Sequence, residues 1–94
     1  MSIEFIAKLE DIIAERSAAS PEESYTARLQ EKGIPFIAQK VGEEAVETAI
    51  EAVQGNTKEL TGEAADLLYH LLVLLRASGL SLADIAAELE RRHS

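Results

Sequence analysis

Apolar residues recur at intervals of three and four along most of the chain, which is the spacing that places them on one face of a helix. Five helical stretches follow from this pattern. They run from Ser2 to about residue 16, from about 21 to 31, from Pro35 to about 54, from about 57 to 77, and from Leu82 to about 92. The pattern therefore predicts an all-α fold, an antiparallel bundle of about five helices, with residues 1–94 as a single domain.

Polar residues and glycines mark where these helices should begin and end. A Ser or Asn followed three residues later by an acid is typical of a capping box, in which each residue's side chain bonds a backbone N–H group of the other. Glycine is common just past the end of a helix. The chain has three such pairs, Ser20 with Glu23, Asn56 with Glu59 and Ser81 with Asp84, while Gly33, Gly55 and Gly79 follow the second, third and fourth helices.

The fourth helix changes character along its length. Up to Asp66 it carries acidic residues on one face, but from Leu67 to Leu75 apolar side chains point in all directions. Such a segment must be buried on every side, and a chain of 94 residues buries only about 60 to 65% of its unfolded surface. Because the other helices offer little material to surround it, we expect a homodimer whose shared core includes this helix.

Composition and charge limit the classes of partner and of metal site. The net charge of -8 argues against a nucleic-acid polymer as partner, since such binding needs a basic face. The chain has no cysteine and only two histidines, which excludes thiolate zinc sites and imidazole clusters. Any bound metal must therefore be held by oxygen atoms.

The sequence also bears on location. Its first residues contain acids and lack the basic-then-apolar order of a signal or transit peptide. The longest apolar run, Leu67 to Leu75, is about half of what crosses a bilayer. We therefore expect a cytoplasmic protein with no membrane partner.

Two short acidic clusters lie on successive predicted helices. Glu44 and Glu47 are three residues apart, as are Glu63 and Asp66, so each pair shares one helix face. A tight turn joins the helices, and the two pairs can then supply four carboxylates to one centre. Asp66 also adjoins the apolar run, where an unpaired carboxylate would cost several kcal/mol. The alternative is a solvated acidic surface, because Glu is a good helix former.

Oxygen ligands alone favour Mg²⁺, Mn²⁺ or Ca²⁺, and the spacing of a calcium-binding EF-hand loop is missing from the sequence. We expect Mg²⁺, with Mn²⁺ as a substitute. Magnesium keeps several waters and completes its shell with phosphate oxygens. A carboxylate-held site of this kind indicates phosphoryl chemistry or cleavage of a nucleotide's diphosphate, with a small-molecule nucleotide as substrate.

The acidic motif and the sequence around it resemble those of a known family. Glu43-Glu44-x-x-Glu47, fifteen residues, and then Glu63-x-x-Asp66 resembles the signature of the all-α nucleotide pyrophosphatases, which include MazG-like and dimeric dUTPase-type enzymes. The chain also resembles the phosphoribosyl-ATP pyrophosphatases of histidine biosynthesis over nearly its whole length. The resemblance is sharpest in three segments, Ser24-Tyr25-Thr26-Ala27, Ala38 to Glu44 and Ala65 to Leu75. The resemblance implies Mg²⁺-dependent hydrolysis of phosphoribosyl-ATP to phosphoribosyl-AMP and pyrophosphate by a cytoplasmic homodimer.

Carried over by position, the resemblance assigns roles to the acidic residues. It makes Glu44, Glu47, Glu63 and Asp66 the metal ligands. Glu43 becomes a further acid beside the site, and three roles stay open for it: ligand of a second ion, base that orients the attacking water, or surface residue.

Basic and aromatic residues are the candidates for binding substrate. Lys40 lies one turn before Glu44 and is the first choice for a phosphate contact. Arg28 and Lys32 are second choices, and Tyr25 packs on the base or the sugar. The alternative for the three cations is a plain surface charge, and for Tyr25 it is packing in the core or at an interface.

Some interpretations remain open. His70 continues the stripe formed by Glu59, Glu63 and Asp66; the favoured interpretation is a histidine satisfied within the dimer core, and the other is a residue that orients a ligand or contacts substrate. For the function, one rival is a broader house-cleaning pyrophosphatase acting on (d)NTPs. The other is a non-catalytic helical dimerisation module whose acids are only surface residues.

Overall fold

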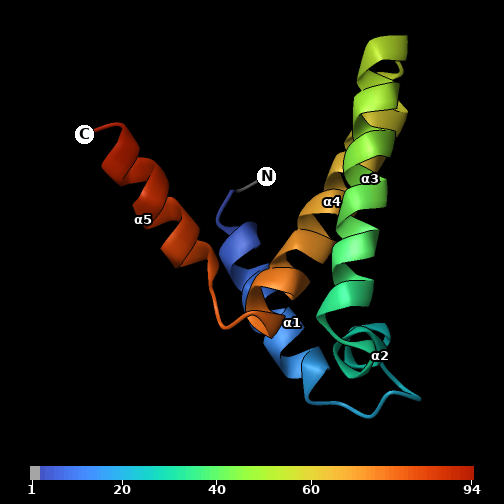
Figure 1. Ribbon diagram of the computed structural model, residues 1–94, viewed down its shortest axis with the longest axis vertical. Helices are drawn as coiled ribbons and strands as arrows, with labels where there is room; N and C mark the ends of the chain where they lie inside the picture. The colour runs from blue at the N-terminus through green and yellow to red at the C-terminus, as the bar shows by residue number, and fades with distance from the viewer. Residues whose placement is uncertain (1–2) are drawn as a thin grey trace.

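The computed structural model describes residues 3–94, and within them it contains five α-helices and no strand. The all-α fold is confirmed. The helices are α1 (Phe5–Ser17), α2 (Tyr25–Lys32), α3 (Ile34–Gln54), α4 (Thr57–Ala77) and α5 (Leu82–Arg92) (Figure 1).

Local signals placed the ends of the later helices correctly. Gly55 ends α3 in the left-handed conformation, with φ of 74°, which a residue without a side chain adopts at no steric cost. At the start of α5 the Ser81–Asp84 capping box is formed: the Asp84 N–H donates to Ser81 Oγ at 3.3 Å, and the Ser81 N–H donates to Asp84 Oδ2 at 2.9 Å. Both α4 and α5 have the predicted bounds.

Two predicted capping boxes are wrong. The second helix begins at Tyr25, about one turn later than predicted, because Ser24 and not Ser20 is its cap: Ser24 Oγ accepts the Ala27 N–H at 3.1 Å. The same hydroxyl donates to the Arg16 carbonyl at 2.9 Å, a tertiary bond that ties the start of α2 to the end of α1.

The predicted capping box of Asn56 and Glu59 is not formed, because the Asn56 side chain makes no hydrogen bond to the backbone at the start of α4. Its side-chain amide instead donates back to Glu51 at 3.1 Å. The first helix begins at Phe5, three residues after the predicted start at Ser2, which lies outside the described residues.

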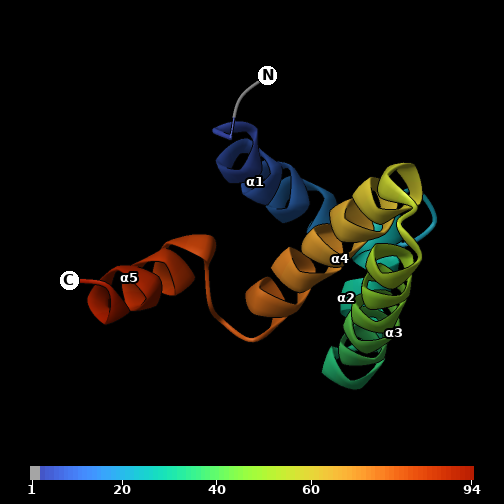
Figure 2. The ribbon, with the colours of Figure 1, turned by 90° about the horizontal axis from the view of Figure 1, so that it is seen from above.

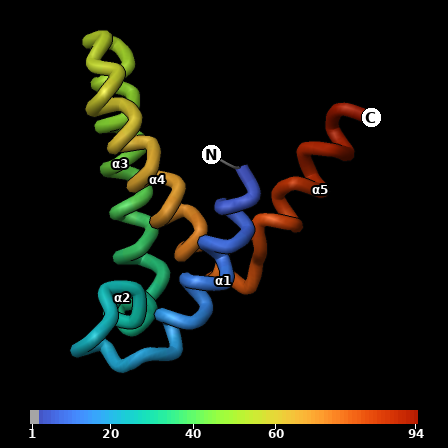
Figure 3. The backbone as a smooth tube through the Cα atoms, turned by 180° about the vertical axis from the view of Figure 1, so that it is seen from behind, coloured from blue at the N-terminus to red at the C-terminus, as the bar shows by residue number. Residues whose placement is uncertain are grey.

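Helices α3 and α4 run antiparallel side by side and form a long hairpin, which Gly55 and Asn56 connect (Figures 1 and 3). The far tip of this hairpin extends away from the other helices. The core lies near the opposite end, where α1 and α2 pack against the hairpin, and is built from one cluster: Ile13, Leu29, Ile37, Leu72 and Val73.

Helix α5 points away from α3 and α4 and has no buried residue (Figure 2). It is attached at its first residue, where the Leu82 N–H donates to the Glu10 carboxylate of α1 at 2.7 Å. The exposed fraction of Leu89 on its outer part is 50%. The helix therefore presents apolar side chains that a single chain leaves uncovered.

The sequence predicted that the apolar run of α4 is buried on every side. The single chain buries only part of it. Leu72 and Val73 are buried, but Leu71 is 36% exposed. No single helix within residues 3–94 has the length and apolar character to cross a membrane, although α4 and α5 together, bent by 101°, meet the criterion on length and composition.

Candidate functional site

The two predicted acidic pairs lie together on the α3–α4 hairpin. Their proximity is evident at Glu63, whose pKa rises from its ordinary value of 4.5 to about 7. The largest cause is a hydrogen bond with the Glu47 carboxyl group, followed by desolvation and then by the negative charges of Glu47, Asp66 and Glu44. All four predicted metal ligands therefore belong to one cluster.

The four side chains differ in exposure. Glu44 is buried, Glu63 is half-buried, and Glu47 and Asp66 are exposed. The burial that the sequence indicated around Asp66 is thus absent from the single chain, because the fully apolar part of α4 begins only after this residue. Glu44 is the member of the cluster that is fixed within the protein.

The cluster fits a hard divalent cation in its chemistry but is not a preformed cage. Among residues 3–94, no three acidic or histidine side chains already converge on a point as metal ligands. However, Glu44 Oε1 is buried and receives no hydrogen bond within this part of the chain. A buried acceptor without a donor is costly, and a cation would relieve that cost. Glu47 and Asp66 are exposed, so burial does not hold their side chains in place.

His70 lies against the buried side of the cluster. Its Nδ1 atom is 2.6 Å from Glu44 Oε1, outside the direction of an ideal N–H hydrogen bond, and 3.0 Å from the Asp66 backbone oxygen. Its Nε2 atom is 2.7 Å from the Tyr25 hydroxyl. His70 is buried and hydrogen-bonded, in line with the favoured sequence interpretation, which did not include the contact with Glu44. That contact bears on the other interpretation, a residue that orients a ligand, for which the stripe of Asp66 and His70 was the signal.

Tyr25 connects the acidic cluster to the basic residues. The pKa of its phenol is raised, and burial is the largest cause. Among the charged neighbours, Lys40 and Arg28 lower this pKa, whereas Glu44 and Tyr69 raise it. Since a charge acts on a pKa only from nearby, Lys40 and Arg28 both lie near the tyrosine and thus near the acidic cluster.

The two cations of α2 have different surroundings. The Arg28 guanidinium lies 5.8 Å from the centre of the Tyr25 ring, and its Nη1 donates to the Pro21 carbonyl at 2.8 Å. Lys32 instead stacks over Phe36, with Nζ 4.3 Å from the ring centre. Arg28 therefore lies on the side of Tyr25, whereas Lys32 is held elsewhere on α2.

Glu43 is not drawn into the cluster. It is exposed, and its carboxylate accepts a hydrogen bond of 3.3 Å from the Gln39 side chain one turn earlier on α3. Its charge is not among the causes of the raised Glu63 pKa.

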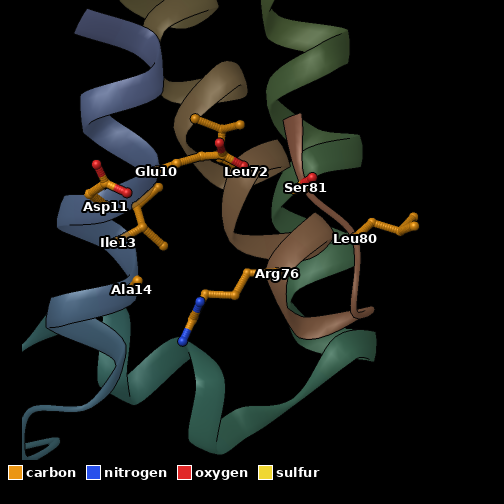
Figure 4. A pocket seen from close by; sticks show the side chains of 8 residues that line it. All are labelled: Glu10, Asp11, Ile13, Ala14, Leu72, Arg76, Leu80 and Ser81. Carbon is orange, nitrogen blue, oxygen red and sulfur yellow. The ribbon is translucent and has the colours of Figure 1, made fainter. Parts of the chain in front are cut away.

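A cavity of about 220 Å³ lies elsewhere, between α1 and the end of α4 (Figure 4). Arg76 lines it together with Glu10, Asp11 and a largely apolar wall. None of the residues predicted for the site borders this cavity, so it is separate from the acidic cluster.

Known proteins resemble this chain over almost its full length. The family model described as phosphoribosyl-ATP pyrophosphohydrolase matches residues 6–93. A phosphoribosyl-ATP pyrophosphatase of Erythrobacter litoralis is 58% identical over 85 residues, which are 90% of this chain and 82% of that protein. One from Pyrobaculum islandicum is 55% identical over 98% of both chains.

A third relative is longer. The histidine biosynthesis bifunctional protein HisIE of Xanthomonas campestris pv. campestris is 58% identical over 96% of this chain, which corresponds to 44% of that protein. The similarity thus extends both to proteins of about this size and to part of a two-function protein. On these matches, the chain belongs to the phosphoribosyl-ATP pyrophosphohydrolase family.

Proposed function

We propose that this protein is a hydrolase of histidine biosynthesis, acting in the cytoplasm, which converts phosphoribosyl-ATP to phosphoribosyl-AMP and pyrophosphate. The observation that carries the proposal is the match to proteins named for this activity over nearly the whole chain. The gathering of two acidic pairs on one hairpin supports it, since such a cluster suits the chemistry of phosphate groups.

The metal-binding residues in this proposal are Glu44, Glu47, Glu63 and Asp66. Mg²⁺ is the proposed ion and Mn²⁺ its substitute, because the ligands are oxygens only. The buried Glu44 oxygen, which accepts no directed hydrogen bond, supports this assignment. When bound, such an ion supplies positive charge to the phosphate oxygens and makes an associated water more acidic.

The chain's own residues would bind and orient the substrate around this cluster. Lys40 and Arg28 are the proposed phosphate contacts, and both lie near Tyr25 beside the site. Lys32 would first have to leave the Phe36 ring. Glu43, which the resemblance places beside the site, is the proposed acceptor of the proton lost by water, and its side chain would first have to leave Gln39 and turn toward the cluster. The water oxygen bonds to the α-phosphorus while the bond from that phosphorus to the bridging oxygen breaks, and pyrophosphate leaves.

The proposal includes a homodimer. One chain carries two uncovered apolar faces, one on α5 with Ile85 and Leu89, and one on the outer part of α3, where Val46, Ile50 and Val53 line a groove of about 320 Å³. A twofold axis would bring the α5 of each copy onto the hairpin of the other and cover both faces at once. The partner is therefore a second copy of this chain.

The activity is tested by comparing phosphoribosyl-ATP with a panel of dNTPs in the presence of Mg²⁺, with release of pyrophosphate as the measurement. We expect the highest kcat/KM for phosphoribosyl-ATP. A higher kcat/KM for any dNTP would instead identify a house-cleaning enzyme.

The same assay tests the metal ligands. Glu47→Gln and Asp66→Asn should each lower kcat/KM by at least about 100-fold and weaken Mg²⁺ binding in calorimetry, because a ligand oxygen is lost. Glu59→Gln is the matched control, since it removes an exposed acid one turn before Glu63 on α4. Equal losses in the control and the ligand variants would show that only general charge matters, and the assignment of ligands would be wrong.

A further inference from the structure

The buried side of the acidic cluster holds an arrangement to which the proposed chemistry gives no role. Three side chains from three helices lie in a row: Tyr25 at the first position of α2, His70 on α4 and Glu44 on α3. The tyrosine hydroxyl is 2.7 Å from His70 Nε2, and His70 Nδ1 is 2.6 Å from Glu44 Oε1. The relative exposures of His70 and Glu44 are only 6% and 8%, so the contact between these two side chains is shielded from water, whereas Tyr25 is 43% exposed.

The chemistry of these contacts fixes where the histidine proton lies. Two oxygen atoms approach Nδ1, one from the Glu44 carboxylate and one from the Asp66 backbone. Both are acceptors, so a bare nitrogen lone pair at that distance would be repelled, and Nδ1 must carry the hydrogen. In the neutral imidazole, Nε2 is then the acceptor and the Tyr25 O–H donates to it.

This row holds Glu44 without saturating it. The Nδ1–H group makes its directed hydrogen bond to the Asp66 carbonyl and attracts the carboxylate from beside that axis. The Glu44 oxygen therefore keeps a free lone pair in a buried position. Among the four clustered acids, only Glu44 is held in this way, whereas Glu47 and Asp66 are exposed.

We propose that Tyr25 and His70 are positioning residues that preset the Glu44 carboxylate as a ligand for the divalent cation. The inference rests on the proposed function, because it deepens the role of the same site. Tyr25 holds the ring orientation of His70 by donating to Nε2, and His70 fixes Glu44. The row also links the first residue of α2, the helix that carries Arg28, to the centre of the cluster.

The first test is the tautomer of His70 in the metal-free protein, read from the ¹⁵N shifts and ring couplings in NMR spectra. We expect the neutral form to carry its proton on Nδ1 in the wild type. In Tyr25→Phe, which keeps the ring and removes the hydroxyl, we expect the proton to stay on Nδ1 and the ¹⁵N shift of Nε2 to change, because its hydrogen bond is lost. A wild-type proton on Nε2 would overturn the proposal without reference to any activity.

The second test is the dissociation constant of Mg²⁺ or Mn²⁺, measured by calorimetry on the full chain. Tyr25→Phe should raise Kd by about 10-fold, within the roughly 10- to 100-fold range for groups that orient a metal ligand. The matched control is Tyr69→Phe. The Tyr69 hydroxyl also bonds from α4 to α2, at Thr26, and its ring also lies against His70, with the ring centres 5.5 Å apart, but it is not in the row.

The control separates positioning from general weakening of the fold. Both variants lose one hydrogen bond between α2 and α4 and should lose thermal stability, but only Tyr25→Phe should change Kd and the ¹⁵N shift of His70 Nε2. Equal Kd values in the two variants overturn the positioning role while the metal site stands. A wild-type protein that binds no divalent cation overturns both the positioning role and the metal site of the proposed function.

Discussion

Glu63 shows how the acidic cluster accommodates its own charge when no cation is bound. Four carboxylates in one place repel each other, and the raised pKa of Glu63 reduces that repulsion, because this carboxyl group keeps its proton up to about pH 7. The hydrogen bond to Glu47 is the largest cause of the raised pKa. A bound cation would replace that proton.

The raised pKa of Glu63 predicts a pH dependence of stability. Because the folded pKa, about 7, lies above the ordinary value of 4.5, the protonated form stabilises the fold fully below about pH 4.5. That contribution to stability is lost as the pH rises through 7. Glu63→Gln keeps a hydrogen-bond donor toward Glu47 at every pH, so its stability should not show this loss.

The measurement is urea unfolding of both proteins, with a chelator present, at pH 5 and pH 8. The stability of the wild type relative to Glu63→Gln should fall between these values. A difference that is constant over the range would contradict the raised pKa of Glu63.

The membership of the acidic cluster could be read from the sequence, whereas its burial and inner contacts could not. A separation of three residues on two successive helices fixes which side chains share a face, and Glu44, Glu47, Glu63 and Asp66 do gather. The exposure of Asp66 and the contact between His70 and Glu44 depend on how far one helix is rotated against the other. Spacing along one helix carries no information about that rotation.

At the scale of the elements, the ends of the helices separate local from tertiary causes. The Ser81–Asp84 capping box and Gly55 act through neighbouring backbone, so the sequence predicted them correctly. Ser20 and Ser24 both had the chemistry to cap α2. Ser24 is the residue that caps α2, and its hydroxyl also donates to the Arg16 carbonyl, a partner that only the folded chain provides.

Removing the formed capping box tests how far α5 depends on it. Ser81→Ala should destabilise the protein by about 1 kcal/mol, since the first turn of α5 loses the acceptor of the Asp84 N–H. Chemical denaturation followed by circular dichroism measures this. Ser78→Ala, in the same connection but without a side-chain cap, is the control and should cost much less. Equal losses would show that the cap has no specific effect.

At the scale of the whole molecule, α5 and the hairpin tip present more apolar surface than a single chain covers. The exposed fraction of Val53 near the tip is 89%, and Ile50 nearby is 48% exposed. The sequence pointed to this through the all-round apolar run of α4. Its uncovered side includes Leu71, but most of the open apolar surface lies on α5 and α3, which no pattern within α4 could reveal.

The proposed dimer is tested by light scattering after size exclusion. The wild type should have twice the mass of the 10.2 kDa chain. Ile85→Asp should be a monomer, because dimerisation would bury the new carboxylate in the apolar contact of α5. Ala87→Asp adds the same charge two residues away, on the other face of α5, and should remain a dimer. A wild-type mass of one chain would refute the proposal.

The short connection between α3 and α4 also bears on the order in which the protein folds. A hairpin closed by two residues forms its contacts locally and quickly, whereas the bond from Glu10 to Leu82 joins residues 72 positions apart and forms only after a long loop closes. We therefore expect the carboxylates to come together early in folding, before α5 is anchored on α1. Their mutual repulsion should oppose this early step, and protonation of Glu63 should accelerate it by removing one of the charges.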